Sequence, residues 1–122
     1  MTKTKILKPA ILIDLKKPLL RIHKDTLYAM ENPEYILLLV NPDERSLAIL
    51  PSDRFDTKAH HISKNSLVNK KSFELYSTAL VQNLRNLCAD WQDDKAYRIF
   101  GELIPNKPVV RFNMTDAVAI NE

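Results

Sequence analysis

The stretch from Leu19 to Leu50 constrains the fold more than any other part of this 122-residue chain. Its first five residues, Leu19–His23, alternate apolar and polar side chains, which is the pattern of a half-buried strand. A short helix is expected next, because Asp25 suits a helix N-terminus and Pro33 disfavours helical backbone at the residue before it. The segment therefore predicts a strand that leads directly into a short helix, whose Tyr28 is expected to face the core.

Two further strands complete this segment as a hairpin. Tyr35–Val40 is a run of six apolar residues bounded by turn signals, which indicates a strand covered on both faces. The residues Asn41–Glu44 have the sequence Asn-Pro-Asp-Glu, a strong turn signal, and Ser46–Leu50 is the expected partner strand. Together these elements predict one strand–helix–hairpin unit.

A looser version of the same pattern returns between Phe73 and Phe112. Phe73–Tyr76 alternates again, and Tyr97–Leu103 with Val109–Met114 forms a second candidate hairpin. The segment between them carries apolar residues at helical spacing, namely Leu80, Leu84, Leu87, Cys88 and Trp91. After the second hairpin, either a short helical turn at Thr115 or a continued strand is expected.

The two segments align as a loose internal repeat. Leu20–Ile22 matches Phe73–Leu75, and Leu27 matches Leu80 at the same spacing of 53 residues. We therefore predict an α+β fold in a single domain of residues 1–122, either a small β-barrel or a mixed sheet built from two pseudo-repeated units. Unit one spans residues 10–51, a polar connector spans 52–72, and unit two spans 73–120. The expected shared core consists of Leu20, Ile22, Leu37, Leu39, Leu75, Leu80, Ile99 and Val110.

Composition excludes several classes of site. The single glycine, Gly101, excludes the glycine-rich loops that cradle phosphates in P-loop and dinucleotide-binding proteins. The single cysteine, Cys88, excludes a disulfide within the chain and is expected to be a small buried apolar residue. Because His23, His60 and His61 lack partners at metal-ligand spacing and no acid–base or nucleophile set is apparent, we expect no metal, no cofactor and no enzyme activity.

The sequence also carries no sign of a membrane segment. No apolar run approaches the ~18 residues that span a bilayer. The apolar run after the lysine-rich start is broken by Asp14 and Lys16 and lacks a cleavage site for a signal peptide. A cytoplasmic location without a membrane partner is therefore expected.

Charge is distributed unevenly along the chain. Residues 1–24 carry seven Lys or Arg against one Asp, and residues 52–72 carry five against two. Residues 25–51, in contrast, carry one basic residue against five acidic ones. Localised basic segments raise affinity for a polyanion, because each neutralised phosphate releases counterions, although basic segments also simply keep proteins in solution.

The first unit resembles the AbrB-type swapped-hairpin domain of bacterial transition-state regulators. The resemblance rests on the order and lengths of Leu19–Ile22, Thr26–Glu31 and Tyr35–Leu50. Two such units in one chain resemble the MraZ arrangement. The family's Gly-Arg before the strand, its following proline and its glycine after the helix are replaced here by Lys17-Pro18, His23 and Asn32, and Arg21 alone carries over as a DNA contact.

The resemblance and the basic segments together predict a small DNA-binding protein, a transcriptional regulator, that binds duplex DNA through its basic N-terminal and connector segments. The candidate DNA-binding residues lie in two sets: Lys16, Lys17, Arg21 and Lys24 near the start, and Lys58, Lys64, Lys70 and Lys71 in the connector. The alternative hypothesis is a protein-interaction adaptor or inhibitor, such as a mobile element encodes, with no nucleic-acid role. Association of copies into a homo-oligomer stays open.

Overall fold

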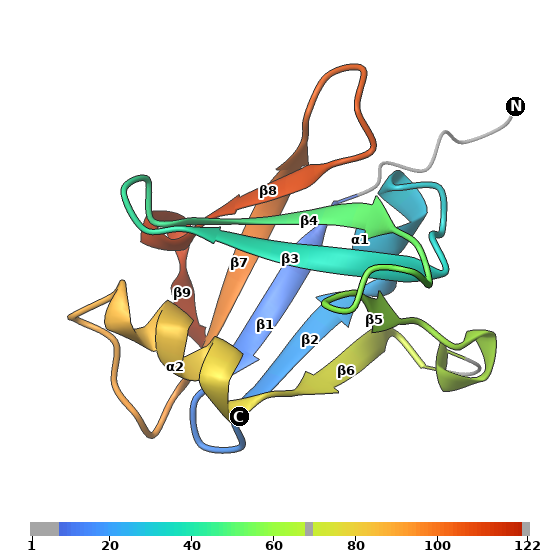
Figure 1. Ribbon diagram of the computed structural model, residues 1–122. Coiled ribbons are helices and arrows are strands. Elements are labelled where there is room, and N and C mark those ends of the chain that lie inside the picture. Colours follow the sequence, from blue (N-terminus) through green and yellow to red (C-terminus); the bar gives the residue numbers. More distant parts are fainter. Residues whose placement is uncertain (1–7, 68–69, 121–122) are drawn as a thin grey trace, which may run out of the picture.

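The computed structural model describes residues 8–67 and 70–120, which form a small α+β domain around a curled antiparallel sheet (Figure 1). Its strands are β1 (Ala10–Asp14), β2 (Leu19–His23), β3 (Tyr35–Asn41), β4 (Ser46–Ser52), β5 (His60–His61), β6 (Ser72–Tyr76), β7 (Ala96–Leu103), β8 (Val110–Asn113) and β9 (Val118–Ile120). The helices are α1 (Lys24–Ala29) and α2 (Thr78–Asn86), with the short 3-10 turns η1 (Lys64–Leu67) and η2 (Met114–Asp116). Neither α-helix in this described part is long and apolar enough to cross a membrane.

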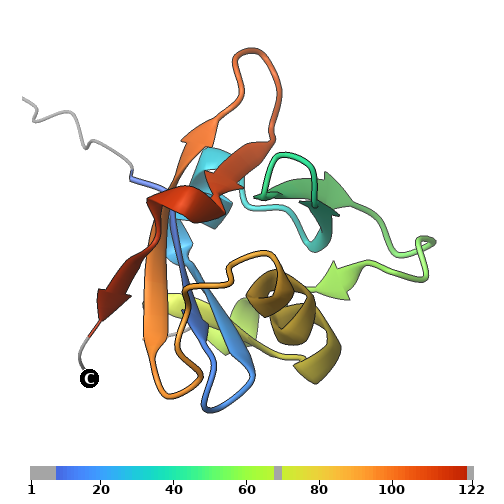
Figure 2. The ribbon, with the colours of Figure 1, turned by 90° about the vertical axis from the view of Figure 1, so that its left-hand side faces the viewer.

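The sheet curls into a half-barrel rather than closing. Its strand order is β5-β3-β4-β8-β7-β1-β2-β6, and β9 adds to β7 beside this path. All of these neighbours pair antiparallel. Figure 2 shows α2 on the open side of the curl, between the β1–β2 strands and the β3–β4 hairpin. The predicted α+β class is thus confirmed, and the sheet is antiparallel rather than mixed.

Strand β7 joins the two parts of the curled sheet. Its first half pairs with β1, and its second half, from Gly101 to Leu103, pairs with β8. At the crossing point, Gly101 lies opposite Phe112, whose side chain is fully buried. The Gly101 N–H also donates to the carbonyl of Pro9 at 2.9 Å, which holds β7 beside the start of β1. The one glycine of the chain therefore lies where the sheet changes direction.

The core lies inside the curl and follows the alternation of the strands. Ile11 and Ile13 of β1 lie opposite Ile22 and Leu20 of β2, and all four side chains are buried. The helices close this interior, with Leu27 and Met30 from the α1 segment and Val81 and Leu84 from α2. Further members of the same cluster come from the second hairpin and its neighbours, namely Leu47, Ile49, Ile99, Val110, Phe112 and Met114.

Both helices begin at side-chain caps. His23, the last residue of β2, precedes α1, and its Nδ1 accepts the N–H of Asp25 at 3.1 Å. Ser77 precedes α2, and its Oγ accepts the N–H of Leu80 at 3.2 Å. Each cap satisfies one of the backbone donors that a helix N-terminus leaves unpaired. The change from strand to helix at His23 is therefore abrupt, as the sequence predicted.

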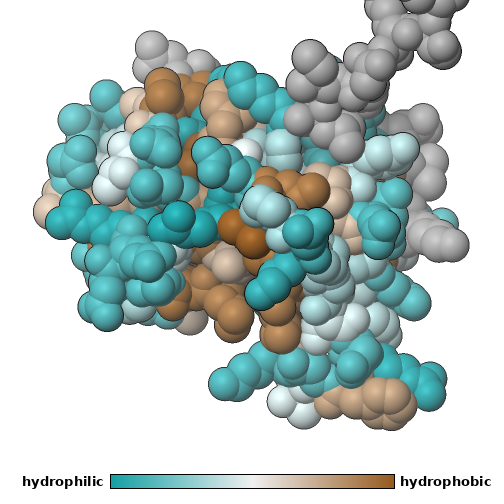
Figure 3. All heavy atoms as spheres, turned by 90° about the horizontal axis from the view of Figure 1, so that it is seen from above, coloured by the Kyte–Doolittle hydropathy of each residue, from teal (hydrophilic) through white to brown (hydrophobic). Residues whose placement is uncertain are grey.

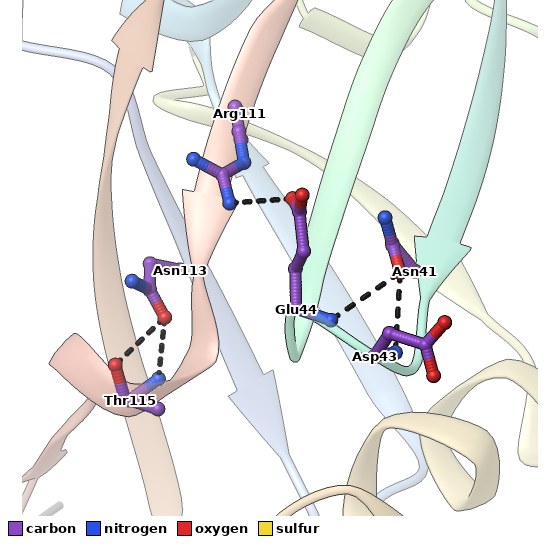
Figure 4. Close-up of polar contacts among 6 residues, drawn as sticks. All are labelled: Asn41, Asp43, Glu44, Arg111, Asn113 and Thr115. Carbon is purple, nitrogen blue, oxygen red and sulfur yellow. Dashed lines mark hydrogen bonds and ion pairs between the residues drawn. The ribbon is translucent and has the colours of Figure 1, made fainter.

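The β3–β4 turn is fixed by polar contacts that Figure 4 shows in detail. Asn41 Oδ1 accepts the N–H groups of Asp43 at 3.1 Å and Glu44 at 3.3 Å, which is the Asx-turn geometry expected of this residue type. Arg111 on β8 reaches Glu44 at 2.8 Å. The ion pair ties the turn to the neighbouring strand on the outer face of the sheet.

Three sequence predictions about side-chain burial were wrong. Leu39 was expected in the core but is 53% exposed, and Leu37 is only half-buried. The reason is strand parity, because Ile36 and its alternate neighbours point inward and leave Leu37 and Leu39 on the outer face. Strand β3 is therefore covered on one face instead of two. Tyr28 of α1, which was also expected to face the core, is exposed.

The other predicted elements are close to those observed. Leu20, Ile22, Ile99 and Val110 are fully buried. The second helix is shorter than its apolar spacing indicated, since α2 ends at Asn86. The remaining apolar residues of that run, Cys88 and Trp91, are buried beyond the helix end. Both outcomes foreseen after the second hairpin occur, because η2 is followed by β9.

Candidate nucleic-acid interface

Two arginines, Arg98 on β7 and Arg21 on β2, lie on the outer face of the part of the sheet formed by β7, β1, β2 and β6. The strand registers place Arg98 beside Leu12, Leu12 beside Arg21, and Arg21 beside Glu74. Because residues directly opposite in neighbouring strands share one face, these side chains form a row perpendicular to the strands. The row carries two arginines and one glutamate around a central leucine.

A shallow pocket of about 320 Å³ opens along this row. It is lined by parts of Ala10, Ile11, Leu12, Arg21, His23, Lys71, Ser72, Arg98 and Ile120. A second depression of about 330 Å³ continues from it and adds Lys70 and Glu74. We call the cationic and imidazole side chains of these two depressions the basic groove: Arg21, His23, Lys70, Lys71 and Arg98.

The charge of the basic groove is only partly compensated. Arg21 Nε lies 3.2 Å from Glu74 Oε2, and both side chains are about one-third exposed. Within residues 8–67 and 70–120, neither Arg98 nor Lys71 forms an ion pair. The backbone fixes the position of Lys71, because its carbonyl accepts the N–H of Lys24 at 2.9 Å. The groove therefore offers positive charge to solvent from the outer face of the sheet and from the segment just before β6.

An exposed aromatic ring borders the basic groove. Phe100 on β7 is opposite Ala10 and is 43% exposed. Lys8 Nζ lies 4.1 Å from the centre of the Phe100 ring, and Arg98 Cζ lies 5.9 Å from it. Cations at these distances are attracted by the negative face of an aromatic ring. The ring thus brings one further positive charge, that of Lys8, to the edge of the groove beside Arg98.

The structure brings together some of the residues that the sequence singled out. Arg21, Lys70 and Lys71 line one depression although 49 residues separate the first two in the sequence. Lys24 is exposed at the start of α1, next to Lys71 through their backbone hydrogen bond. These four residues come from both predicted sets.

The remaining predicted residues lie elsewhere. Lys16 and Lys17 are in the β1–β2 turn, at the far end of β2 from Lys24, a distance of about 17 Å for five strand residues. Lys58 lies in the loop between β4 and β5, and the side chain of Lys64 is outside the described part of the structure. The predicted row Lys16, Lys17, Arg21 and Lys24 is therefore spread along the whole length of one strand.

Sequence reasoning missed Arg98, His23 and Lys8 as members of this surface. The alternation of Tyr97–Leu103 does place Arg98 opposite the core-facing residues of its strand. The missing information was that β7 pairs with β1, which brings Arg98 to Leu12 from a sequence distance of 86 residues. Alternation predicts the face of a strand, but it does not predict the strand's neighbour.

Two other features fit a structural role better. A cavity of about 620 Å³ is lined by Leu27, Asn32, Pro33, Glu34, Ile62 and Leu67, without the gathering of like charges seen in the basic groove. Cys88 is 5% exposed, and burial, together with the nearby Asp90, raises the pKa of its thiol. A buried thiol with a raised pKa is a poor nucleophile, as expected for a packed apolar residue.

Comparison with known proteins identifies no relative. The chain matches no protein-family model, no curated protein and no solved structure. The functional interpretation consequently rests on the residues of this surface and on the physical chemistry of their arrangement.

Proposed function

We propose that this protein binds DNA through the basic groove and that it belongs among small transcription regulators. The observation that carries the proposal is the convergence of Arg21, Lys70, Lys71 and Arg98 on one outer face of the sheet. These four cations come from three separate segments of the chain. Folding therefore brings them together, in contrast to the charges of a single basic tail. Guanidinium and ammonium groups are the usual partners of DNA phosphates.

A phosphate interface of this size has a measurable salt dependence. Four neutralised phosphates correspond to a slope of about −3.6 in a plot of log binding constant against log salt concentration. Because such contacts are made to the backbone, they carry little sequence information by themselves. We therefore expect measurable affinity for mixed-sequence duplex DNA at low salt and a steep loss of affinity as salt is added.

Removing two cations of the groove is the sharpest test. We expect the double variant Arg98→Ala/Lys71→Ala to lower duplex affinity at least about tenfold at low salt and to reduce the salt slope by about 2, one unit for each lost phosphate contact. Fluorescence anisotropy with a labelled mixed-sequence duplex measures both quantities. The matched control, Arg54→Ala/Lys107→Ala, also removes one arginine and one lysine, from two exposed loop positions away from the groove. Equal losses in both variants would show that only net charge matters.

We also propose that the fold is related to the AbrB-like class, and the pairing of its strands supports this relation. Counterpart strands of the two units lie side by side, β2 with β6 and β4 with β8. If β5 is taken as the counterpart of β1, and β7 as the counterpart of β3, then the pairing of β1 with β7 corresponds to the pairing of β5 with β3. Arg21 lies opposite Glu74, the residue 53 positions later that the repeat assigns to it. An approximate two-fold axis through this pair accounts for all of these pairings.

A second candidate function, binding to another protein, is favoured by a different surface. The outer face of the β3–β4 hairpin presents Leu37, Leu39, Ala48 and Leu50, which are exposed or half-buried. Figure 3 shows hydrophobic side chains gathered in the middle of this side of the molecule, between hydrophilic regions. Apolar patches on a sheet face often mark interaction sites. This face lies on a different part of the sheet from the basic groove.

The two candidate functions separate in a nuclease-treated pull-down. If the hairpin face binds a protein, the wild-type chain should retain that partner after nuclease treatment. The Leu39→Gln variant should no longer retain it. Val118→Gln is the matched control, because Val118 is 62% exposed and lies on β9. A partner that disappears from the wild-type sample on nuclease treatment argues for the DNA function instead.

A further inference from the structure

We propose that the pocket between β7, β1 and β2 holds one unpaired nucleotide of a bound strand. The base would lie on the apolar floor, and its phosphates would contact the cationic rim. This inference rests on the proposed DNA-binding function and narrows it to the class of nucleic acid that the pocket prefers, namely strands with exposed bases.

The size of the pocket limits what it can hold. At about 320 Å³ it lies at the lower end of the range for small-molecule sites, which is about 300–1,000 Å³. A DNA duplex, whose major groove alone is about 12 Å wide, can only rest its backbone across such a depression. A single base rotated out of its stack is small enough to enter it.

The floor of the pocket is apolar at its centre. Leu12 is half-buried and lies directly between Arg98 and Arg21 in the sheet register. Ala10 and Ile120 extend this apolar surface on either side. A site that bound phosphate alone would gain nothing from these side chains, whereas the flat face of a base can cover them and remove apolar area from water.

The rim supplies the two kinds of polar contact that a nucleotide requires. Arg98 and Arg21 lie on either side of Leu12 in the sheet register, and Lys71 lines the same pocket, so all three can offer charged donors to phosphate oxygens. His23 and Ser72, opposite one another on β2 and β6, place an imidazole and a hydroxyl at the edge of the same pocket. Because Nδ1 of His23 already accepts the N–H of Asp25, its Nε2 is left as a hydrogen-bond donor, whereas the Ser72 hydroxyl can donate or accept. Both groups therefore suit the edge of a base.

Phe100 extends the same surface by one position. Phe100 lies opposite Ala10, which lines the pocket. The cationic groups of Lys8 and Arg98 lie close to its partly exposed ring. An exposed ring beside cations is the combination with which proteins stack bases and track the backbone of single strands. A base next to the bound nucleotide can stack on this ring.

The test compares probes that differ only in their bases. Fluorescence anisotropy is recorded for wild-type protein with a labelled oligo-dT strand, an abasic strand of the same length and charge, and a duplex. We expect the oligo-dT strand to bind about tenfold more tightly than the abasic strand, within the range that stacking of one base provides. Leu12→Gln should shrink this ratio, while Leu103→Gln, on the part of β7 that pairs with β8, should leave it unchanged.

The outcomes distinguish this inference from the proposed function. If the duplex binds and the oligo-dT and abasic strands bind equally, the nucleotide pocket is wrong and the DNA-binding function stands. If no probe binds at low salt, both are wrong. Competition with free thymidine monophosphate and with inorganic phosphate then shows whether the pocket recognises the base or the phosphate alone. Stronger competition by the nucleotide supports the nucleotide pocket, and equal competition contradicts it.

Discussion

Replacing Gly101 by alanine is expected to destabilise the fold by about 1–3 kcal/mol, the usual cost of overpacking a tight interior. A Cβ atom at this position would lie 2.5 Å from Cε1 of Phe112 and 2.8 Å from its Cδ1. The Phe112 ring is fully buried between Gly101 on β7 and Leu47 on β4, so it has little room to move. Chemical denaturation of the full chain measures the change in free energy of unfolding.

The sign of this effect is informative. Gly101 does not adopt a left-handed backbone conformation, so alanine fits its backbone, and loss of disorder in the unfolded chain alone would stabilise the variant by about 0.4–1 kcal/mol. A net destabilisation therefore reports the clash with Phe112. In the Phe112→Leu background the ring atoms are gone, and Gly101→Ala should cost at least about 0.5 kcal/mol less. Equal costs in the two backgrounds would contradict this explanation.

Local patterns in the sequence predicted most of the secondary structure. Leu19–His23 and Phe73–Tyr76 show the alternation of strands, and the structure has strands at Leu19–His23 and Ser72–Tyr76. Turn residues also predicted the strand ends, because β3 ends at Asn41, directly before Pro42, as expected. These features depend on side chains within a few residues of each other, which is the range over which backbone preferences and caps act.

Burial on β3 shows where such reasoning stops. Six consecutive apolar residues predicted a strand covered on both faces, yet the outward side chains of Leu37 and Leu39 are not in the core. An apolar run is compatible with a buried strand or with an apolar outer face, and the choice depends on what packs against it. That information lies in the tertiary arrangement of α2 and the neighbouring strands.

The candidate site was predictable only in part for the same reason. Net charge along the chain pointed to the segments that hold Arg21, Lys70 and Lys71. The charge count also pointed to Lys16, Lys17 and Lys58, because it contains no information on where each side chain lies in the folded protein. Arg98 lies in a segment of net negative charge, and only the pairing of β7 with β1 makes it part of the groove.

The second large effect is expected at Thr26, a buried residue of α1 whose side chain replaces the backbone partner of a β1 residue. Its Oγ1 accepts the N–H of Ala10 at 2.9 Å and donates to the carbonyl of Ala10 at 3.0 Å. Strand β2 ends at His23, so this hydroxyl satisfies the first residue of β1 where the β2 backbone turns away into the helix. An isolated helix of six residues has little stability of its own, so contacts such as this one hold α1 in place.

Thr26→Val should therefore lower the free energy of unfolding by about 2–3 kcal/mol, because it keeps the shape of the side chain but leaves two backbone groups of Ala10 unpaired. The matched variant Thr26→Ser keeps both hydrogen bonds and loses one buried methyl group, which costs about 1 kcal/mol. Urea denaturation ranks the two, and amide hydrogen exchange at Ala10 should accelerate in Thr26→Val only. If serine costs as much as valine, the packing of the methyl group rather than the paired hydrogen bonds anchors α1 to the sheet.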